Sequence, residues 1–247
     1  MIINTGTHAS FGSVPGLADA KPLTHVEALE LEELPEHLLI IGGGYVGLEL
    51  AQAFRRFGSN VTVIDRNDRL MNREDDDVVE TLQDIFEVEG VVVVFKARIR
   101  SVSGRSGESV RIVVKDGNEA EKTLEGSHLS VAAGREPNTQ GIGLELAGIE
   151  LTESGYIKVN ERLETTAPRV WAIGEVAGSP QFNDGITGGK RVTTGRQVPF
   201  CLFTDPEFAR IGLSEKEARA QGIGYRCSRF RWKRSCVLPR FLKRKDF

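Results

Sequence analysis

The sequence predicts an α/β protein built around a parallel sheet, and three features indicate this fold. Residues 38–41 (LLII) form a short, uninterrupted apolar run, as expected of a parallel strand that is buried on both faces. Three glycines follow, and residues 45–57 then place apolar side chains at helical spacing before Gly58. A second apolar run at 61–64 completes a strand–helix–strand unit, whose connection is expected to be right-handed.

Further elements are expected on either side of this unit. Residues 1–36 hold a short apolar start, glycine- and proline-rich turns and an acidic stretch, which predict a peripheral strand and a linker. Beyond the unit, Asp77 is expected to cap a second helix that ends at Gly90. Residues 91–95 then predict a third buried strand.

The pattern changes toward the middle of the chain. Apolar residues Val110, Ile112 and Val114 alternate with polar ones up to the turn Asp116-Gly117-Asn118, which predicts an antiparallel hairpin or meander. Residues 129–133 are expected to form a last core strand.

The composition of the 247 residues is ordinary for a globular protein. Hydrophobic residues make up 40%, charged residues 27%, and the formal net charge is −3. This balance argues against a role of the whole chain in binding nucleic acid or a membrane surface. There is no apolar run long enough to span a membrane and no secretory signal pattern, so a cytoplasmic location is the default expectation.

Cysteines and histidines do not suggest a metal site or a catalytic group. Cys201, Cys227 and Cys236 have neither C-x-x-C nor metal-ligand spacing, and Cys201 is expected to be a buried, inert thiol in an apolar run. The acidic residues 74–77 are interpreted as a solvated cluster at a helix N-terminus. The histidines are interpreted as surface or linker residues, namely His8, His25, His37 and His128.

The glycines after the first strand match the G-x-G-x-x-G pattern of dinucleotide-binding loops. Gly42 permits a tight turn out of the strand, Gly44 lets backbone N–H groups approach a pyrophosphate, and Gly47 lets the helix pack closely. The N-terminus of that helix favours the phosphates. Tyr45 and Val46, between the last two glycines, belong to the same candidate site. A purely structural glycine turn is the alternative.

An acidic residue stands where such a loop needs one. Asp65 ends the second strand, where a carboxylate accepts hydrogen bonds from the ribose hydroxyls of the adenosine half. It favours NAD, because a carboxylate there repels a 2′-phosphate, whereas Arg66 follows immediately and leaves NADP open. The alternative for both residues is a solvated loop start.

Four further segments follow one another in a recognisable order: 2–16 (IINTGTHASFGSVPG), 131–139 (VAAGREPNT), 170–178 (VWAIGEVAG) and 198–218 (VPFCLFTDPEFARIGLSEKEA). With the glycine loop they resemble the pyridine nucleotide-disulfide oxidoreductase family, mercuric reductase and dihydrolipoyl dehydrogenase-like members included. In order, they resemble the crossover from the flavin domain, the return to it, the flavin-contacting motif and the start of the dimerisation domain. The flavin motif usually has Asp where this chain has Glu175.

The resemblance implies a flavoprotein that passes electrons from NAD(P)H through FAD to an acceptor, and a homodimer in the full-length family. It implies a Rossmann-like, parallel-sheet NAD(P)-binding domain at 37–133 inserted in a partial FAD-binding domain. The FAD-domain parts are 1–36 and 134–190, the start of the dimerisation domain is 191–226, and 227–247 form an aberrant basic tail.

The resemblance also assigns roles to residues outside the glycine loop. Glu175 would bond the ribityl or pyrophosphate region of FAD, and Glu49 would lie near the nicotinamide and flavin rings. Gly6 and Gly174 would allow the backbone to approach FAD. The alternatives are an exposed helix residue for Glu49 and ordinary turns for the glycines. The candidate residues implied in this way are Thr5, Gly6, Glu49, Gly134, Gly174 and Glu175.

The chain departs from the family pattern in ways that predict a fragment. A first glycine-rich loop for FAD, a C-x-x-x-x-C pair and the C-terminal His-Glu pair are not found in it, so no catalytic residue is named. Residues 183–189 are too few for the helix expected there, which predicts a deletion of about three helical turns. From Cys227 onward a frameshift product is the leading hypothesis, and a basic nucleic-acid arm is the rival.

Two functions therefore remain open at this point. The first is a flavin-dependent oxidoreductase fragment with an unidentified electron acceptor. The second is a non-catalytic dinucleotide-binding remnant that lacks the redox centre. A separate polypeptide that supplies the missing half is a third possibility.

Overall fold

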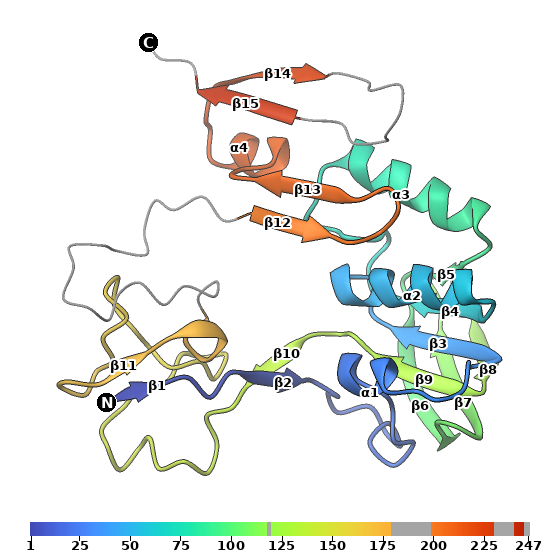
Figure 1. Ribbon diagram of the computed structural model, residues 1–247, viewed down its shortest axis with the longest axis horizontal. Coiled ribbons are helices and arrows are strands. Elements are labelled where there is room, and N and C mark those ends of the chain that lie inside the picture. The colour runs from blue at the N-terminus through green and yellow to red at the C-terminus, as the bar shows by residue number, and fades with distance from the viewer. Residues whose placement is uncertain (118–119, 179–198, 230–239, 245–247) are drawn as a thin grey trace. The chain divides into compact units, whose positions relative to one another are not determined.

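The computed structural model describes residues 1–117, 120–178, 199–229 and 240–244, and divides the chain into two compact units. One unit comprises residues 1–10 and 134–198, and the larger unit comprises residues 11–133 and 199–247 (Figure 1). The expected deletion at 183–189 lies outside the described residues.

The larger unit contains a four-stranded, fully parallel sheet, which confirms the predicted α/β class. Residues Leu38, Leu39 and Ile40 of its central strand are fully buried, as the uninterrupted apolar run predicted. Val92, expected to be buried, is more than half exposed because its strand lies at the sheet edge. In sheet order the strands are β5 (Val92–Val94), β4 (Asn60–Ile64), β3 (His37–Ile41) and β9 (His128–Val131).

Three helices lie in the N-terminal part of the same unit, between residues 11 and 133. The second, α2 (Tyr45–Phe57), ends as expected at Gly58, whose φ of +114° suits glycine. The third, α3 (Asp76–Val88), begins two residues earlier than predicted, because Asp75 and not Asp77 is its N-cap. The first, α1 (His25–Leu29), lies in the presumed linker and is stabilised by a capping box between Thr24 and Glu27.

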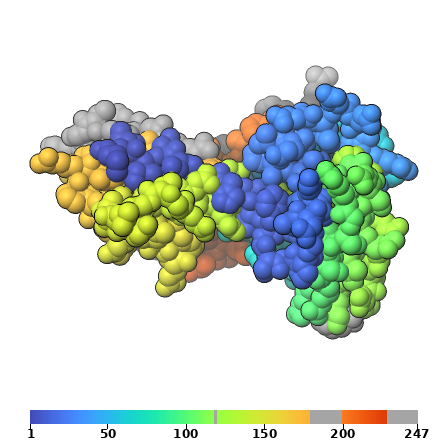
Figure 2. Space-filling model, turned by 90° about the horizontal axis from the view of Figure 1, so that it is seen from below, coloured from blue at the N-terminus to red at the C-terminus, as the bar shows by residue number. Residues whose placement is uncertain are grey.

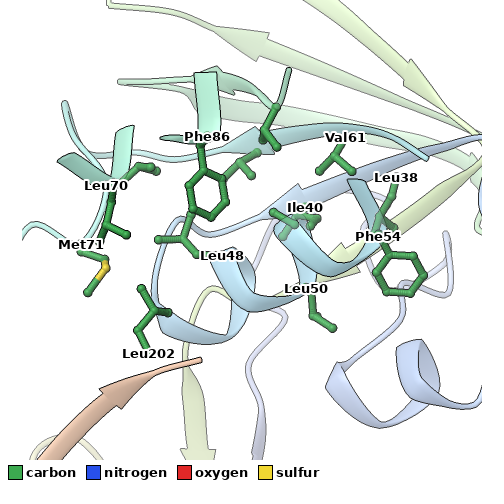
Figure 3. Packing of buried hydrophobic residues seen from close by; sticks show 14 of the residues in the cluster. Leu38, Ile40, Leu48, Leu50, Phe54, Val61, Leu70, Met71, Phe86 and Leu202 are labelled. Atoms are coloured by element: carbon green, nitrogen blue, oxygen red, sulfur yellow. The ribbon is translucent and has the colours of Figure 1, made fainter. Parts of the chain in front are cut away.

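Side chains from both faces of the sheet form two hydrophobic clusters. Leu38 and Ile40 point toward α2 and α3, where they pack with Leu48, Phe54 and Phe86 (Figure 3). On the opposite face, the alternate residues Leu39 and Ile41 join side chains from an antiparallel sheet. The predicted meander is therefore confirmed as β6 (Arg98–Arg105), β7 (Ser109–Lys115) and β8 (Glu121–Gly126).

The segment that follows the first ten residues is held against this meander. Pro15 O accepts a hydrogen bond of 2.9 Å from Val102 N, and Ala20 O accepts one of 2.8 Å from Ser106 N. The dark blue segment therefore lies beside the green strands in Figure 2. Residues 11–20 complete the cover of the sheet rather than forming a free linker.

The C-terminal part of the larger unit begins with an antiparallel hairpin of β12 (Pro199–Leu202) and β13 (Phe208–Ile211). Strand alternation places Leu202 in the core beside α2, whereas Cys201 is exposed, so the expectation of a buried Cys201 thiol is wrong. The remaining elements are α4 (Glu215–Ala220) and the antiparallel pair β14 (Tyr225–Arg229) and β15 (Arg240–Arg244).

Two histidines were wrongly assigned to the surface or to linkers. His37 begins β3 and His128 begins β9, and both side chains are half-buried. His37 Nε2 lies 2.9 Å from Thr62 Oγ1 on the neighbouring strand. Burial lowers the pKa of both imidazoles, because it disfavours the charged form.

The smaller unit has short strands around a core of its own. β1 (Ile2–Ile3) pairs in parallel with β11 (Trp171–Ala172), and β2 (Thr7–Ala9) pairs antiparallel with β10 (Arg135–Pro137). A 3₁₀ helix, η1 (Gly174–Ala177), follows β11. The core side chains are Ile3, Leu144, Ile149, Ile157, Ala167, Ala172 and Val176.

Candidate functional site

The glycine loop joins β3 to α2 through two close backbone contacts. At Gly42, φ is +112°, and a Cβ would lie 2.5 Å from Ala132 O. At Gly47, a Cβ would lie 2.0 Å from Gly42 O. Because real Cβ atoms do not approach backbone atoms so closely, neither position can accept a side chain without moving the loop.

Gly44 differs from its two neighbours in the motif. It is the N-cap of α2, has a φ of −88°, and a Cβ there would meet no atom within 4 Å. The packing of the protein therefore does not require a glycine at position 44. No side-chain hydrogen bond caps α2 at Gly44, and the first-turn N–H groups of a helix favour an anion. Val46, in that first turn, is exposed.

Asp65 is buried at the end of β4 and holds the loop from the side. Its Oδ2 accepts a hydrogen bond of 2.6 Å from Gly43 N, and its Oδ1 accepts two bonds of 2.7 Å from the backbone and side chain of Asn67. The carboxylate thus joins the strand end to the loop in addition to the ribose contact expected for it. Arg66 is exposed.

Replacing Asp65 tests this support. In Asp65→Asn, the new amide NH₂ faces an N–H donor, which leaves at least one buried donor without an acceptor. The free energy of unfolding is expected to fall by about 1–3 kcal/mol, measured by urea denaturation followed by circular dichroism. Asp68→Asn, at an exposed carboxylate in the same loop, is the control and should be within about 0.5 kcal/mol of wild type. Equal stability of the two variants would contradict a bracing role.

Tyr45 connects the loop to the C-terminal hairpin through a buried carboxylate. The Tyr45 hydroxyl donates a hydrogen bond of 2.7 Å to Glu74 Oε1, and Arg210 Nε lies 2.9 Å from Glu74 Oε2. Burial of the phenol, followed by its hydrogen bond to Glu74 and then by the charge of Glu74, raises the pKa of Tyr45 well above its usual value. Burial acts to lower the pKa of Arg210, but Glu74 and then Glu217 outweigh it and raise this pKa.

The side of α2 holds the turn between β12 and β13. Glu49 accepts a hydrogen bond of 2.8 Å from Phe203 N. Gln52 Oε1 accepts a bond of 2.7 Å from Asp205 N, and Gln52 Nε2 donates one of 3.0 Å to Asp205 O. Glu49 is thus half-buried and bonded to the hairpin, rather than the exposed helix residue of the alternative interpretation.

The candidate flavin residues gather in the smaller unit. Thr5 Oγ1 donates a hydrogen bond of 2.8 Å to Asn138 O, and Gly6 O accepts one of 3.0 Å from Asn138 N. Gly6 has a φ of +66° and Gly174 one of +71°, conformations that favour glycine. A Cβ at Gly174 would lie 2.7 Å from Asn4 Oδ1, so this glycine is also required by packing.

Glu175 is held by two side chains that sequence reasoning did not identify. The Thr7 hydroxyl donates to Glu175 Oε2, and Arg135 Nε lies 3.3 Å from the same oxygen. Arg135 Nη2 also donates a bond of 2.9 Å to Thr7 O. Gly134, just before Arg135, has a φ of +143° and accepts a bond from Ser10 N at its carbonyl. The glycine-rich residues and Glu175 therefore lie together around β2, β10 and η1.

Other kinds of site are not seen in the part of the chain that the structure describes. Within it, no group of histidine, cysteine and acidic side chains is placed to hold a metal ion. Among the same residues, no helix has both the length and the apolar character needed to cross a bilayer.

Comparison with protein-family models gives two matches along the chain. Residues 1–194 match the model of the pyridine nucleotide-disulphide oxidoreductases. Residues 198–237 match the model of the dimerisation domain of the same proteins.

Individual relatives agree with these matches. The chain is 37% identical over 236 residues to a mercuric reductase of Streptomyces lividans, which covers 91% of this chain and 49% of that protein. It is 38% identical over 217 residues to a dihydrolipoyl dehydrogenase of Thermus scotoductus, covering 82% of this chain and 46% of that protein. The chain spans about half the length of the curated relatives that it matches.

A solved structure shows the same architecture. The HOCl-induced flavoprotein disulfide reductase RclA of Escherichia coli superposes with a TM-score of 0.81 at 33% sequence identity. The match covers 93% of this chain and 55% of that one.

Proposed function

Since the chain belongs to the pyridine nucleotide-disulphide oxidoreductase family, we propose that it is part of a flavin-dependent oxidoreductase and provides its site for NAD(P)H. The observation that carries this proposal is the loop between β3 and α2. There, packing leaves no room for a side chain at Gly42 or Gly47, whereas Gly44 faces open space at a helix N-terminus. A turn with a structural role alone would not need glycine at position 44.

Among the two nicotinamide dinucleotides, we propose a preference for NADH over NADPH. The Asp65 carboxylate lies directly beside the loop, where its charge disfavours the 2′-phosphate of NADPH. The exposed Arg66 offsets part of this effect, so the preference is expected to be modest. Measuring the two dissociation constants side by side tests the choice.

The smaller unit supports a contact with FAD. Thr5, Gly6, Gly134, Gly174 and Glu175 all belong to it, and its three candidate glycines have positive φ, a conformation that favours glycine. FAD, when bound, supplies the acceptor for the hydride of NADH. Glu175 is proposed to bind a flavin hydroxyl while Thr7 and Arg135 hold its carboxylate in place. A homodimer through the domain that begins near residue 198 is part of the same proposal.

The proposal is tested by titrating the chain with NADH and following the fluorescence of the nucleotide. Wild type is expected to bind, and Gly44→Val is expected to lose binding by about tenfold or more at unchanged thermal stability, because its side chain would fill the open space. Equal binding by Gly44→Val would place the nucleotide elsewhere and overturn the proposal.

The second candidate is a dinucleotide-binding protein without a redox centre. It is favoured by the spacing of Cys201 and Cys227, the cysteines within the described residues, which are exposed and do not form a C-x-x-x-x-C pair. Reconstitution with FAD distinguishes the two functions. Retained yellow flavin that NADH bleaches supports the oxidoreductase, whereas NADH binding without retained flavin supports the second candidate.

A further inference from the structure

We propose that Arg210 is a positioning residue for dinucleotide binding, and that it acts through Glu74 and Tyr45 on the glycine loop. The inference rests on the proposed function, since it concerns the affinity of the same loop. It adds a dependence of that loop on the β12–β13 hairpin, which lies far from the loop in sequence.

Glu74 is the centre of the arrangement. Its side chain is 2% exposed and has one oxygen toward Tyr45 and the other toward Arg210. Tyr45 is the first residue of α2, so its hydroxyl contact fixes the turn of the helix that faces the loop. The carboxylate is therefore shared between the loop and the hairpin.

The Arg210 guanidinium is itself held in one place. Nη1 donates a hydrogen bond of 2.7 Å to Gly212 O and lies 3.3 Å from Glu217 Oε2, and the guanidinium carbon lies 4.5 Å from the centre of the Phe200 ring. The side chain is 16% exposed. Arg210 thus presents a fixed positive charge to Glu74 rather than a mobile one.

The segment that carries Glu74 touches the loop at a second point. Met71 N donates a hydrogen bond of 3.1 Å to Gly43 O, and Leu70, immediately before it, is fully buried against the loop. Residues 70–74 are thus joined to both Gly43 and Tyr45. A displacement of Glu74 is expected to move this short segment and with it the loop backbone.

The negative charge of Glu74 links this arrangement to the affinity of the loop for its ligand. A buried carboxylate close to a phosphate-binding loop opposes an anionic ligand, because the low local dielectric strengthens repulsion. Arg210 compensates that charge. Without Arg210, Glu74 becomes an uncompensated buried anion, a strongly unfavourable state, and it repels the pyrophosphate. The additional change Glu74→Gln removes the charge and with it the need for Arg210.

Three variants of the full chain test the inference, with NADH as the probe. Arg210→Met is expected to weaken NADH binding by about tenfold or more, and Arg210→Met/Glu74→Gln to return it to within about threefold of wild type. Arg56→Met is the matched control. Arg56 also joins α2 to the hairpin, because its guanidinium lies 2.8 Å from the Asp205 carboxylate. It forms a second ion pair of 2.6 Å with Glu89 at the end of α3, and it does not contact Glu74. It should bind NADH as wild type does.

A role confined to docking the hairpin predicts a different pattern. In that case the double variant would remain as weak as Arg210→Met, because the guanidinium contacts stay lost. Unchanged binding by Arg210→Met, or a loss that Glu74→Gln does not rescue, would overturn the inference.

Failure of the proposed function is recognised separately by hydrogen exchange without any ligand. Amides of residues 43–47 should exchange faster in Arg210→Met than in wild type or Arg56→Met. If wild type does not bind NADH but this difference is found, the proposed function fails and the coupling stands. Equal exchange in all three proteins overturns the coupling.

Discussion

Gly47→Ala is expected to lower the free energy of unfolding by about 3 kcal/mol and to abolish NADH binding. The new Cβ would lie 2.0 Å from Gly42 O and 3.4 Å from the Ala132 Cβ. Relief requires movement of backbone in both α2 and the loop, because the blocking atom is a carbonyl oxygen rather than the end of a flexible side chain. Urea unfolding and NADH titration of the same samples measure the two effects.

Gly44→Ala is the matched control in the same motif. Its Cβ meets nothing within 4 Å, and its φ of −88° suits any residue, so unfolding should change by less than about 1 kcal/mol. We expect Gly44→Ala to lose NADH affinity and keep its stability, whereas Gly47→Ala should lose both. This difference would show that Gly44 is needed for the ligand and Gly47 for the packing of the helix against the loop. A Gly47→Ala variant as stable as Gly44→Ala would contradict the close approach of α2 to the loop.

Phe86→Ala is expected to cost about 3–5 kcal/mol of stability. Phe86 is 1% exposed and packs from α3 against Leu48 and Ile40 in the cluster between helices and sheet (Figure 3). Truncation removes a buried ring and leaves a cavity that the sheet cannot close. The change in the urea midpoint at constant slope measures the loss.

Phe57→Ala provides the comparison for Phe86. Phe57 lies at the end of α2 with 69% of its surface exposed, and its ring contacts Phe54 edge-on at 6.2 Å between centroids. Its loss should cost less than about 1.5 kcal/mol. Similar costs for the two phenylalanines would show that Phe86 is not part of the core.

Local patterns in the sequence predicted the parallel sheet and the loop for a physical reason. The run at 38–41 had to be buried on both faces, and in the structure Leu38 and Ile40 face α2 while Leu39 and Ile41 face the meander. The glycines at 42 and 47 likewise follow from short-range geometry. Such features depend on neighbours within a few residues and are therefore readable from sequence.

Other features depend on partners that local patterns do not specify. Four consecutive acidic residues made the start of α3 ambiguous, and Asp75 is the cap rather than Asp77. Cys201 is exposed because β12 packs only one face against the core. The apolar composition of this strand does not indicate which face that is. The contacts of Glu74 with Arg210 and of Glu175 with Arg135 join residues from separate segments, and no spacing rule identifies them.

The order of strands in the larger unit also has a consequence for folding kinetics. β3 pairs with β4 soon after both have been synthesised, but its other edge pairs with β9, and His37 and Ser127 are 90 residues apart. Loop closure over that distance is slow, and until it occurs the apolar edge of β3 stays open to other chains. Nascent chains of this protein are therefore expected to pass through an interval in which aggregation competes with closure of the sheet, and chaperone supply should affect the yield of folded protein.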